Sequence, residues 1–352
     1  MKVLFLSTDG RGLSVAHKIK SEGYDIDVFV KNRTAAHMCN GFLNMVESWR
    51  PHVRDSDFIV CDGPGWGDKY ETLRGSGRPV FGCDELTDKI NLDYSANQEL
   101  LKRSGIPVEV SGEVTGVPIR LEGWWNGRSW LAPFFYVFPH TKLFQGDLGP
   151  HVEDMGSIVL ASHKESKMIT ETSKGLKPFL MKTKYKGPVS IYLYVTEDLI
   201  SSFGIYFGMV FDGMDAIMEG LREPVTDLLF ETSVGVKKKV DVSDWYMVAV
   251  RYSISPWPYS GASAAVQLHG INENNLKHIQ LHDVFESESS FFTGAHDCVP
   301  FKVTSRAGDL REALRRAYRT LSNLSTENHQ YRLDIGADTK NAWEQLLAWK
   351  WV

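Results

Sequence analysis

The sequence predicts an α/β protein that begins with a doubly wound parallel sheet and continues as an α+β structure. Over the first hundred residues, apolar runs of strand length alternate with stretches of helical periodicity, which is typical of a parallel sheet with helices on both faces. After residue 108, strand-like runs surround a polar loop and one helix, which favours antiparallel strands. A chain of 352 residues is also long enough for two or three domains.

The N-terminal part contains four runs with the composition of buried strands. They cover residues 2–7, 25–30, 57–64 and 78–83. Helical periodicity is found over residues 12–22, and again over residues 84–104, where Gly105 and Pro107 end it. This order of elements predicts strand–helix units.

The rest of the chain contains further strands and three clearer helical stretches. Strands are expected at residues 117–125, 129–138, 190–195, 202–211, 245–254, 264–271 and 298–305, and helices at 163–176, 214–230 and 309–322. The last residues, 338–352, are expected to form a short helix. No internal repeat occurs.

Composition limits the classes of function. The charged fraction is 24%, the hydrophobic fraction is 43% and the net charge is −5, so a strong basic field for non-specific nucleic-acid binding is not indicated. No run of 18 apolar residues predicts a membrane span. The four cysteines are scattered without a C-x-x-C pair, which argues against a zinc site or a disulfide frame and favours a reducing, cytoplasmic location.

Two turns after predicted strands are candidate ligand-binding positions. Ligands of doubly wound sheets sit beyond the carboxyl ends of the strands, and a helix N-terminus there favours anions. The first turn supplies Gly10, Arg11 and Gly12, and the second supplies Gly63 and Pro64. We expect these residues to bind substrate.

The polar loop at residues 140–156, HTKLFQGDLGPHVEDMG, is the third candidate. It is too rich in glycine, proline and charge for the interior of a helix or strand. Its candidate residues are His140, Lys142, Asp147, Gly149, Pro150, Glu153 and Asp154. The adjacent carboxylates at 153 and 154 would hold an amino group or act as a general base, with a solvated turn as the alternative interpretation.

These motifs occur in a specific order along the chain. DGRGLSVAHKI, DGPGWGD, the helix ending in GIP and the 140–156 loop are followed by VTSRAGDLREALRRAYRTLSN and YRLDIG. In this order the sequence resembles glycinamide ribonucleotide synthetase (phosphoribosylamine–glycine ligase) of the ATP-grasp superfamily. The resemblance covers nearly the whole chain, is most specific at the C-terminal end, and is weak in the middle.

The resemblance implies a three-part organisation. Residues 1–107 would form the N-terminal doubly wound parallel sheet, residues 108–236 a reduced ATP-grasp-like α+β core, and residues 237–352 a small C-terminal α+β domain with a tail. The basic triplet at 237–239 would be the linker. Arg332 and Asp334 of YRLDIG are expected to form a structural ion pair.

The sequence departs from the family where ATP and Mg²⁺ chemistry would be carried out. The family's ATP-covering lid, with its glycine-rich Lys turn, has no counterpart after Ile106-Pro107. The positions of the family's Glu and Asn ligands for Mg²⁺ hold Ser202 and Gly204, and Asp212 and Asp215 nearby are the available partial substitutes. In the polar loop, the family has the sequence Asn-Thr-Gly-Gly. This chain has His-Val-Glu-Asp at the same positions, residues 151–154.

We therefore expect a transferase that joins an amino acid, with glycine the first candidate, to an already activated nucleotide, sugar or DNA base. By analogy, some phage systems modify DNA with amino acids. Neither metal nor cofactor is expected, Asp147, Glu153 and Asp154 are the predicted catalytic residues, and the other candidates named above bind substrate. The alternatives are an ATP- and Mg²⁺-dependent ligase of purine biosynthesis, and a non-catalytic binding protein.

The remaining motifs favour structural roles. The aromatic cluster WWNGRSW, with Arg120 and Arg128, is expected to pack in the core, and stacking on a base is the alternative. No Ser-His-Asp or Cys-His signature points to nucleophilic catalysis.

Overall fold

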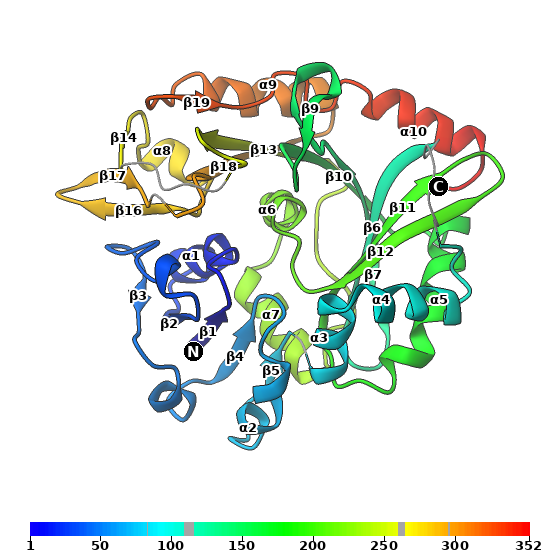
Figure 1. Ribbon diagram of the computed structural model, residues 1–352, viewed down its shortest axis with the longest axis horizontal. Coiled ribbons are helices and arrows are strands. Elements are labelled where there is room, and N and C mark those ends of the chain that lie inside the picture. The colour runs from blue at the N-terminus through cyan, green and yellow to red at the C-terminus, as the bar shows by residue number, and fades with distance from the viewer. Residues whose placement is uncertain (83, 109–115, 260–264, 295) are drawn as a thin grey trace.

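The computed structural model describes residues 1–352 except 83, 109–115, 260–264 and 295. A parallel sheet from the N-terminal part and a larger antiparallel sheet form two sides of the molecule (Figure 1). Helix α6 (Phe211–Gly220) lies near the centre, between the two sheets. The predicted α/β fold class, with parallel and antiparallel sheets, is confirmed.

The N-terminal sheet has five parallel strands in the order β3-β2-β1-β4-β5. The strands are β1 (Lys2–Ser7), β2 (Asp25–Val30), β3 (Asn44–Met45), β4 (Phe58–Cys61) and β5 (Val80–Phe81). They form because their apolar side chains are covered on both faces, and Val3 to Leu6 are fully buried. The strand order reverses at β1, so the carboxyl ends of β1 and β4 open into one crevice.

The helices of this part are shorter than expected. They are α1 (Leu13–Ser21), α2 (Tyr70–Arg74), α3 (Glu85–Leu92) and α4 (Tyr94–Arg103), with 3₁₀ turns at 33–35, 50–53 and 67–69. The helical stretch predicted over 84–104 is divided into α3 and α4, because Asp93 takes an extended conformation and its side chain accepts a hydrogen bond from the Ala96 N–H to begin α4. The predicted strand at 78–83 ends at residue 83, which lies outside the described residues.

The second sheet has nine antiparallel strands, eight of them in the order β12-β11-β6-β7-β10-β13-β18-β15. They are β6 (Val117–Trp125), β7 (Trp130–Pro139), β10 (Gly156–Ser162), β11 (Gly187–Val195), β12 (Ile200–Phe207), β13 (Tyr246–Ile254), β15 (Ile279–Leu281), β18 (Phe301–Ala307) and β19 (His329–Gln330), which pairs with β13. Strands from both sides of the predicted boundary at 237 pair directly within this sheet, because β10 is bonded to β13. The three-domain division stays a prediction.

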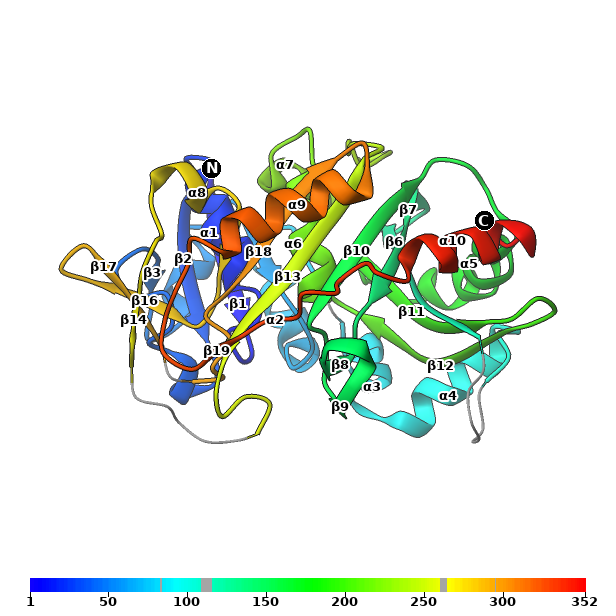
Figure 2. The same ribbon diagram turned by 90° about the horizontal axis from the view of Figure 1, so that it is seen from above.

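Helices cover both faces of the large sheet. From above, α9 (Leu310–Leu321) and α10 (Thr339–Ala348) lie along its outer face (Figure 2). On other sides lie α5 (Lys167–Leu180), which Ser166 caps, and α7 (Val225–Val234). The helical stretch predicted over 214–230 is divided into α6 and α7, because the backbone is extended at Leu221 and Pro224 is the residue just before the second helix.

The free edge of the large sheet is covered by amide side chains from α3 and α4. Asn91 pairs with both backbone groups of Phe207, and Asn97 pairs with both backbone groups of Ile205. These bonds satisfy the edge of β12 and fix the helical segment that comes just before the sheet.

The remaining elements are small. A hairpin of β8 (Lys142–Phe144) and β9 (Leu148–His151) is joined by a 3₁₀ turn at 145–147, and β14 (Gln267–Leu268), β16 (Val284–Ser287) and β17 (Ser290–Thr293) form a three-stranded sheet beside α8 (Glu273–Leu276). The predicted strand at 264–271 is reduced to β14, and its first residue lies outside the described range. Among the described helices, none combines the length and apolar character needed to span a membrane.

Candidate functional site

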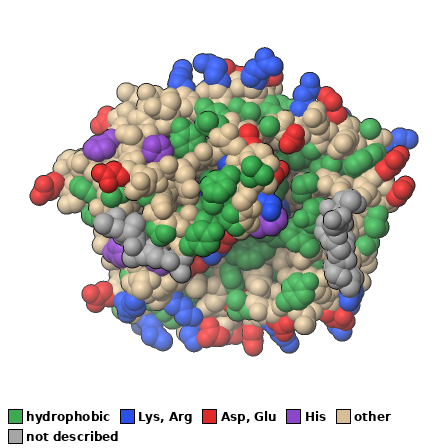
Figure 3. Space-filling model, turned by 45° about the horizontal axis from the view of Figure 1, so that its top comes forward, with side chains coloured by type: hydrophobic (Ala, Val, Ile, Leu, Met, Phe, Trp, Pro, Cys, Tyr) green, Lys and Arg blue, Asp and Glu red, His purple; other side chains and the backbone are tan. Residues whose placement is uncertain are grey.

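A cavity of about 810 Å³ lies between the first turn of the parallel sheet and the inner face of the large sheet. Its size is within the range of small-molecule sites. The face in Figure 3 is hollowed near its centre, with hydrophobic side chains around the recess. The polar side chains that line the cavity are Arg11, Arg120, Thr141, His151, Glu153, Asp154, Tyr192, Tyr194, Tyr206, Asp212, Arg251, His282, Asp297 and Lys302.

A buried ion pair forms one wall of the cavity. Asp212, in the first turn of α6, accepts two hydrogen bonds from Arg251 of β13, one of them from Nε to Oδ1 at 3.2 Å. Burial opposes ionisation of Asp212, but the attraction of Arg251 outweighs it and lowers the Asp212 pKa. The pair therefore stays charged inside the protein.

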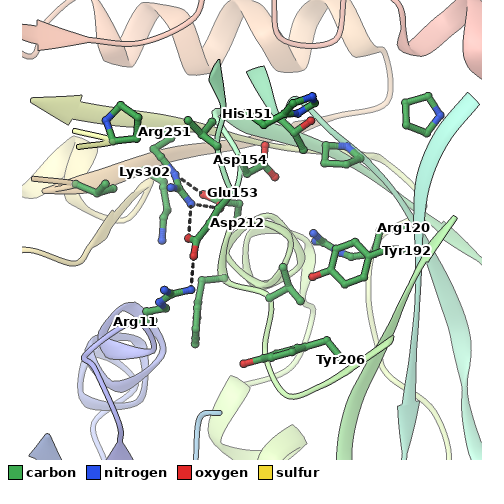
Figure 4. Close-up of a pocket in the computed structure, with 18 of the residues that line it drawn as sticks. Arg11, Arg120, His151, Glu153, Asp154, Tyr192, Tyr206, Asp212, Arg251 and Lys302 are labelled. Atoms are coloured by element: carbon green, nitrogen blue, oxygen red, sulfur yellow. Dashed lines mark hydrogen bonds and ion pairs between the residues drawn. The ribbon is translucent and has the colours of Figure 1, made fainter. Parts of the chain in front are cut away.

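The polar loop reaches this wall through Glu153. Its carboxylate is bonded to the guanidinium of Arg11, and its Oε2 lies 3.9 Å from Nη2 of Arg251. Figure 4 shows Arg11, Glu153, Arg251 and Asp212 as one cluster on one side of the cavity. The link between Arg11 and Glu153 joins two regions that the sequence separates by 142 residues.

Asp154 is buried next to this cluster and has an unusual proton affinity. Burial, together with the charge of Asp212, raises the Asp154 pKa to about 7. Its carboxylate accepts hydrogen bonds from the N–H groups of His140 and Gly156, at 3.1 and 2.8 Å, and from the hydroxyl of Ser157. A carboxylate has about four acceptor positions, so one remains for a group in the cavity.

Lys302 and Asp215 form a second buried pair beside the first. The two side chains are 3.0 Å apart, and Asp215 also accepts a 2.7 Å hydrogen bond from Ser14. In the sequence, Asp212 and Asp215 are the nearby carboxylates that could stand in for the missing Mg²⁺ ligands. In the structure each of these carboxylates has a basic side chain as its partner.

The opposite wall is aromatic and holds one further cation. Rings of Tyr192 and Tyr194 on β11 pack against Phe203 on β12, with centroids 5.5 and 5.1 Å apart. Arg120 projects from β6 beside Tyr192 and faces the charged cluster across the cavity (Figure 4). The Arg120 side chain is therefore buried, as expected, and also lines the cavity.

A histidine–aspartate pair completes the lining. Nε2 of His282 lies 2.6 Å from Oδ2 of Asp297. Although burial opposes it, the attraction of His282 and this hydrogen bond hold the pKa of Asp297 well below its usual range. Asp283 is next to this pair and accepts three backbone N–H bonds from residues 296–298, which fix the loop.

Four of the predicted residues of the polar loop, Lys142, Asp147, Gly149 and Pro150, lie away from the cavity. Asp147 makes a 2.8 Å ion pair with Arg332, which also pairs with Asp334 as expected. Lys142 reaches only the Gly149 carbonyl, at 3.4 Å, and Gly149 and Pro150 belong to the hairpin strand. None of Asp147, Lys142, Gly149 and Pro150 lines the cavity. Their catalytic and binding roles stay predictions, and the ion pair of Asp147 fastens the hairpin to the C-terminal segment.

His140 has a structural role as well. Its Nδ1 lies 3.1 Å from the Gly156 carbonyl, and its Nε2 accepts the Gly336 N–H at 2.9 Å. Both ring nitrogens are therefore used inside the protein. Burial, with the nearby charge of Arg332, lowers the pKa of His140, in agreement with a neutral ring. The predicted substrate contact of His140 stays a prediction.

The turn after β1 is already filled by a carboxyl group of the protein itself. The Asp62 carboxylate accepts the Gly12 N–H at 3.0 Å, and the Gly10 N–H donates to Ser7 Oγ at 2.8 Å. A Cβ atom on Gly12 would lie 2.5 Å from Asp62 Oδ2, so glycine is required for this approach. Gly10 and Gly12 therefore do not present free N–H groups for a phosphate, and the Arg11 side chain is the part of the turn that lines the cavity.

The turn after β4, which contains Gly63 and Pro64, is also occupied by contacts within the protein. The Pro64 carbonyl accepts a 2.6 Å hydrogen bond from Thr8, and Gly63 lies against the hydroxyl of Tyr206. Neither Gly63 nor Pro64 lines the cavity, and their contact with substrate stays a prediction. They shape the crevice edge on which Tyr206 rests.

Ser202 and Gly204, at the positions of the family's Mg²⁺ ligands, do not fit that ion. The Ser202 hydroxyl is buried and donates to the carbonyl oxygens of Tyr192 or Gly204, at 2.9 and 3.2 Å, and Gly204 has no side chain. Mg²⁺ prefers carboxylate and amide oxygens in octahedral arrangement. Among the described residues, no group of three or more His, Cys, Asp or Glu side chains is arranged to hold a metal ion.

Of the predicted site residues, Arg11, Glu153 and Asp154 come together in the cavity. Sequence reasoning missed the pairing of Arg251 with Asp212 and the presence of Lys302. A signal for both was available, because VAVRYSI and VPFKVTS are apolar strands interrupted by a single basic residue. Lys and Arg are seldom buried unless they are paired or functional.

Comparison with known proteins shows which sequences and folds this chain is similar to. The sequence is 24% identical over 304 residues to the phosphoribosylamine–glycine ligase of Caldanaerobacter subterraneus subsp. tengcongensis, and this match covers 83% of this chain and 67% of that protein. The crystal structure of phosphoribosylamine–glycine ligase from Thermotoga maritima matches with a TM-score of 0.74 at 15% identity, over 95% of this chain and 100% of that one. No known protein-family model matches the sequence.

Other ligases and carboxylases share the architecture at lower similarity. The biotin carboxylase from Campylobacter jejuni has a TM-score of 0.61 at 10% identity, over 92% of this chain and 91% of that one. The L-amino acid ligase from Bacillus licheniformis has a TM-score of 0.58 at 13% identity, over 92% of this chain and 98% of that one. The protein therefore has an ATP-grasp fold. Within this class, its fold is that of glycinamide ribonucleotide synthetase, as the sequence motifs predicted.

Proposed function

We propose that the protein joins an amino acid to a substrate already activated by a phosphate or diphosphate group, and does so without ATP. The observation that carries this proposal is a charged cavity of ligand size. It is supported by Ser202 and Gly204, which stand where the family resemblance places the Glu and Asn ligands of Mg²⁺. In addition, α4 ends at Arg103 and β6 begins at Val117, which leaves too short a segment for an ATP-covering lid. The glycine ligase fold supports an amino acid as the amine donor.

The proposed reaction balances without a further reactant. The amine nitrogen attacks the carbon that carries the diphosphate, a C–N bond forms, and the C–O bond breaks. The diphosphate leaves with the electron pair of that bond, and the proton of the amine passes to a carboxylate of the cavity. Holding amine and acceptor together supplies the orientation that such a displacement requires.

Asp154 is the residue that we assign to the proton transfer. A general base works best when its pKa is near the working pH, and burial raises the Asp154 pKa to about 7. Glu153, at the rim, would contact the ammonium group before reaction. The cations Arg11, Arg251 and Lys302 lie on the same side, where they would stabilise the negative charge on the departing phosphate.

The aromatic wall supports a ring-bearing acceptor. Tyr192, Tyr194 and Phe203 offer flat apolar surface for a base or a sugar face. We therefore expect a phosphorylated nucleotide or sugar, with a modified DNA base as a further candidate. The cytoplasmic location expected from the sequence stays a prediction.

A direct transfer assay tests this proposal. Radiolabelled glycine is incubated with the protein and phosphoribosyl pyrophosphate, nucleoside diphosphates, or DNA carrying phosphorylated bases, in the absence of ATP. Label transfer with release of phosphate or diphosphate is expected, and it should be lost in Asp154→Asn but kept in the exposed-site control Glu197→Gln. Absence of transfer without ATP, together with transfer when ATP is added, would overturn the ATP-independent mechanism.

The second candidate is an ATP-dependent phosphoribosylamine–glycine ligase, which the similarity to two enzymes of that name favours. It predicts ADP formation from ATP, glycine and phosphoribosylamine in the presence of Mg²⁺. A non-catalytic binding protein, the third alternative, predicts that Arg11→Ala and Asp154→Asn leave the biological activity intact.

A further inference from the structure

We propose that Arg120 binds the α-carboxylate of the amino acid, and so fixes the donor's orientation in the cavity. This inference rests on the proposed function, because it takes an amino acid as the ligand. It adds a residue that the glycine-ligase resemblance did not assign to any role.

The first observation is that Arg120 is buried without a hydrogen-bond acceptor. Its side chain is 2% exposed and lines the cavity, and its Nε and Nη2 atoms have no partner among the described residues. The nearby carboxylate of Glu122 instead accepts bonds from Trp124 and Ser190, at 3.2 and 3.3 Å. A guanidinium that is desolvated in this way is costly unless an anion satisfies it.

The second observation is the position of Arg120 at the start of a helix. A Cβ atom on Gly213 would lie 2.0 Å from Nη2 of Arg120, so the guanidinium is packed against the first turn of α6. The N-terminus of a helix carries partial positive charge, and it disfavours a cation. An anion in the cavity beside Arg120 and this turn would be attracted by both, which favours a bound carboxylate or phosphate.

The third observation favours a carboxylate over a phosphate. The other cations of the cavity, Arg11, Arg251 and Lys302, line the cavity with Arg120, and each of them has a carboxylate partner. In the close-up, Arg120 lies on the other side of the cavity from the cluster that contains Arg11 and Arg251 (Figure 4). One planar guanidinium matches one carboxylate in a bidentate pair, whereas a diphosphate is bound by several cations.

The geometry of the cavity then suits a zwitterion. The carboxylate lies against Arg120, whose guanidinium carbon is 5.9 Å from the ring centre of Tyr192. The amine extends toward Glu153 and Asp154 on the charged side. This orientation directs the amine toward the proposed proton acceptor and toward the cations that stabilise the leaving phosphate.

Calorimetric binding of matched ligand pairs to the full-length protein tests the inference. The probes are glycine, L-serine and L-lysine, each compared with its amide: glycinamide, L-serinamide and L-lysinamide. Each amide keeps the amine and the shape but removes the carboxylate charge. At least one acid should bind about tenfold or more tightly than its amide, because a charge-assisted bidentate pair is lost in the amide. Equal affinity in all three pairs would overturn the inference without any mutation.

Substitution at Arg120 separates the two anion sources. Arg120→Met should weaken binding of the preferred amino acid roughly 10–100-fold and remove the preference over the amide. Arg128→Met, at an exposed position of the turn between β6 and β7, is the matched control and should bind as the wild type does. Circular dichroism and the melting temperature verify that each variant is folded, and Arg120→Lys offers a second variant that keeps the charge but loses the bidentate fit.

Pyrophosphate binding is measured in the same variants. Unchanged pyrophosphate affinity in Arg120→Met, with weakened amino-acid binding, supports the assignment. Weakened pyrophosphate affinity with unchanged amino-acid binding would assign Arg120 to the acceptor and overturn it. Consumption of ATP in the transfer assay would end the proposed ATP-independent mechanism, but it would leave the carboxylate assignment standing, so the two failures are distinguishable.

Discussion

Asp62 provides a prediction whose size follows directly from the structure. Its carboxyl group lies at the end of β4, is 2% exposed, and accepts the Gly12 N–H. Burial raises its pKa from 3.8 to about 7. A carboxyl group with a raised folded-state pKa contributes stability below its unfolded-state pKa, and this stability is lost as the pH rises through the folded-state pKa.

The substitution Asp62→Asn keeps the acceptor oxygen for Gly12 and removes the titration. A shift of about 3 pK units corresponds to about 4 kcal/mol in full, and about 2–3 kcal/mol of that falls between pH 5 and pH 8. The Asn variant should therefore gain about 2–3 kcal/mol in unfolding free energy relative to the wild type when the pH is raised from 5 to 8.

Urea denaturation at the two pH values measures this difference. The exposed Asp198→Asn variant is the matched control and should follow the wild type at both pH values. If Asp62→Asn also follows the wild type, burial at the end of β4 does not favour the neutral form of this carboxyl group, and the account of its raised pKa is wrong.

Three further predictions concern the cavity and its loop. Arg251→Met should reduce the unfolding free energy by about 3–5 kcal/mol because it leaves the buried Asp212 charge unpaired, and a melting temperature equal to that of the wild type would contradict this. Transfer activity should rise with pH through about 7 as Asp154 loses its proton, and a residual activity in Asp154→Asn with the same pH dependence would exclude Asp154 as the base. Asp147→Ala should leave amino-acid binding unchanged and cost at most about 1 kcal/mol, because its carboxylate is 64% exposed; loss of binding would return Asp147 to the site.

The sequence predicted the fold well where the pattern is local. The strands at 2–7 and 25–30 and the helix after residue 309 follow from runs of apolar residues with strand or helix spacing. The two merged helices were missed although their breaks have ordinary signals, a capping residue at Asp93 and a proline at 224. The helical periodicity of apolar residues continues across each break, so the breaks were not recognised.

The site was predicted in part because its residues come from distant segments. Part of the predicted polar loop lines the cavity, but the outer residues of the loop and residues 151–154 have different surroundings. The outer residues His140 and Asp147 bind the C-terminal segment, while Glu153 and Asp154 reach the cavity. A sequence motif indicates which residues share a loop, but it does not indicate which of them face a ligand.

The basic residues of the cavity could not be predicted from the sequence, because their positions depend on tertiary pairing that no local pattern specifies. Arg251 and Lys302 lie in adjacent strands, and their carboxylate partners lie one turn apart on α6. The signal in the sequence was a single basic residue inside each apolar strand. The position of Arg120 against Gly213 depends on the packing of β6 and α6, which only the structure reveals.

The products formed during glycine transfer test the central claim most directly. The protein is incubated with labelled glycine, the activated acceptor, and ATP with Mg²⁺, and the phosphate or diphosphate released from the acceptor is quantified together with ADP. We predict one equivalent of phosphate or diphosphate from the acceptor for each glycine joined, with no ADP formed, and the same yield when ATP is omitted. One equivalent of ADP for each glycine joined, with no transfer in the absence of ATP, would contradict the account.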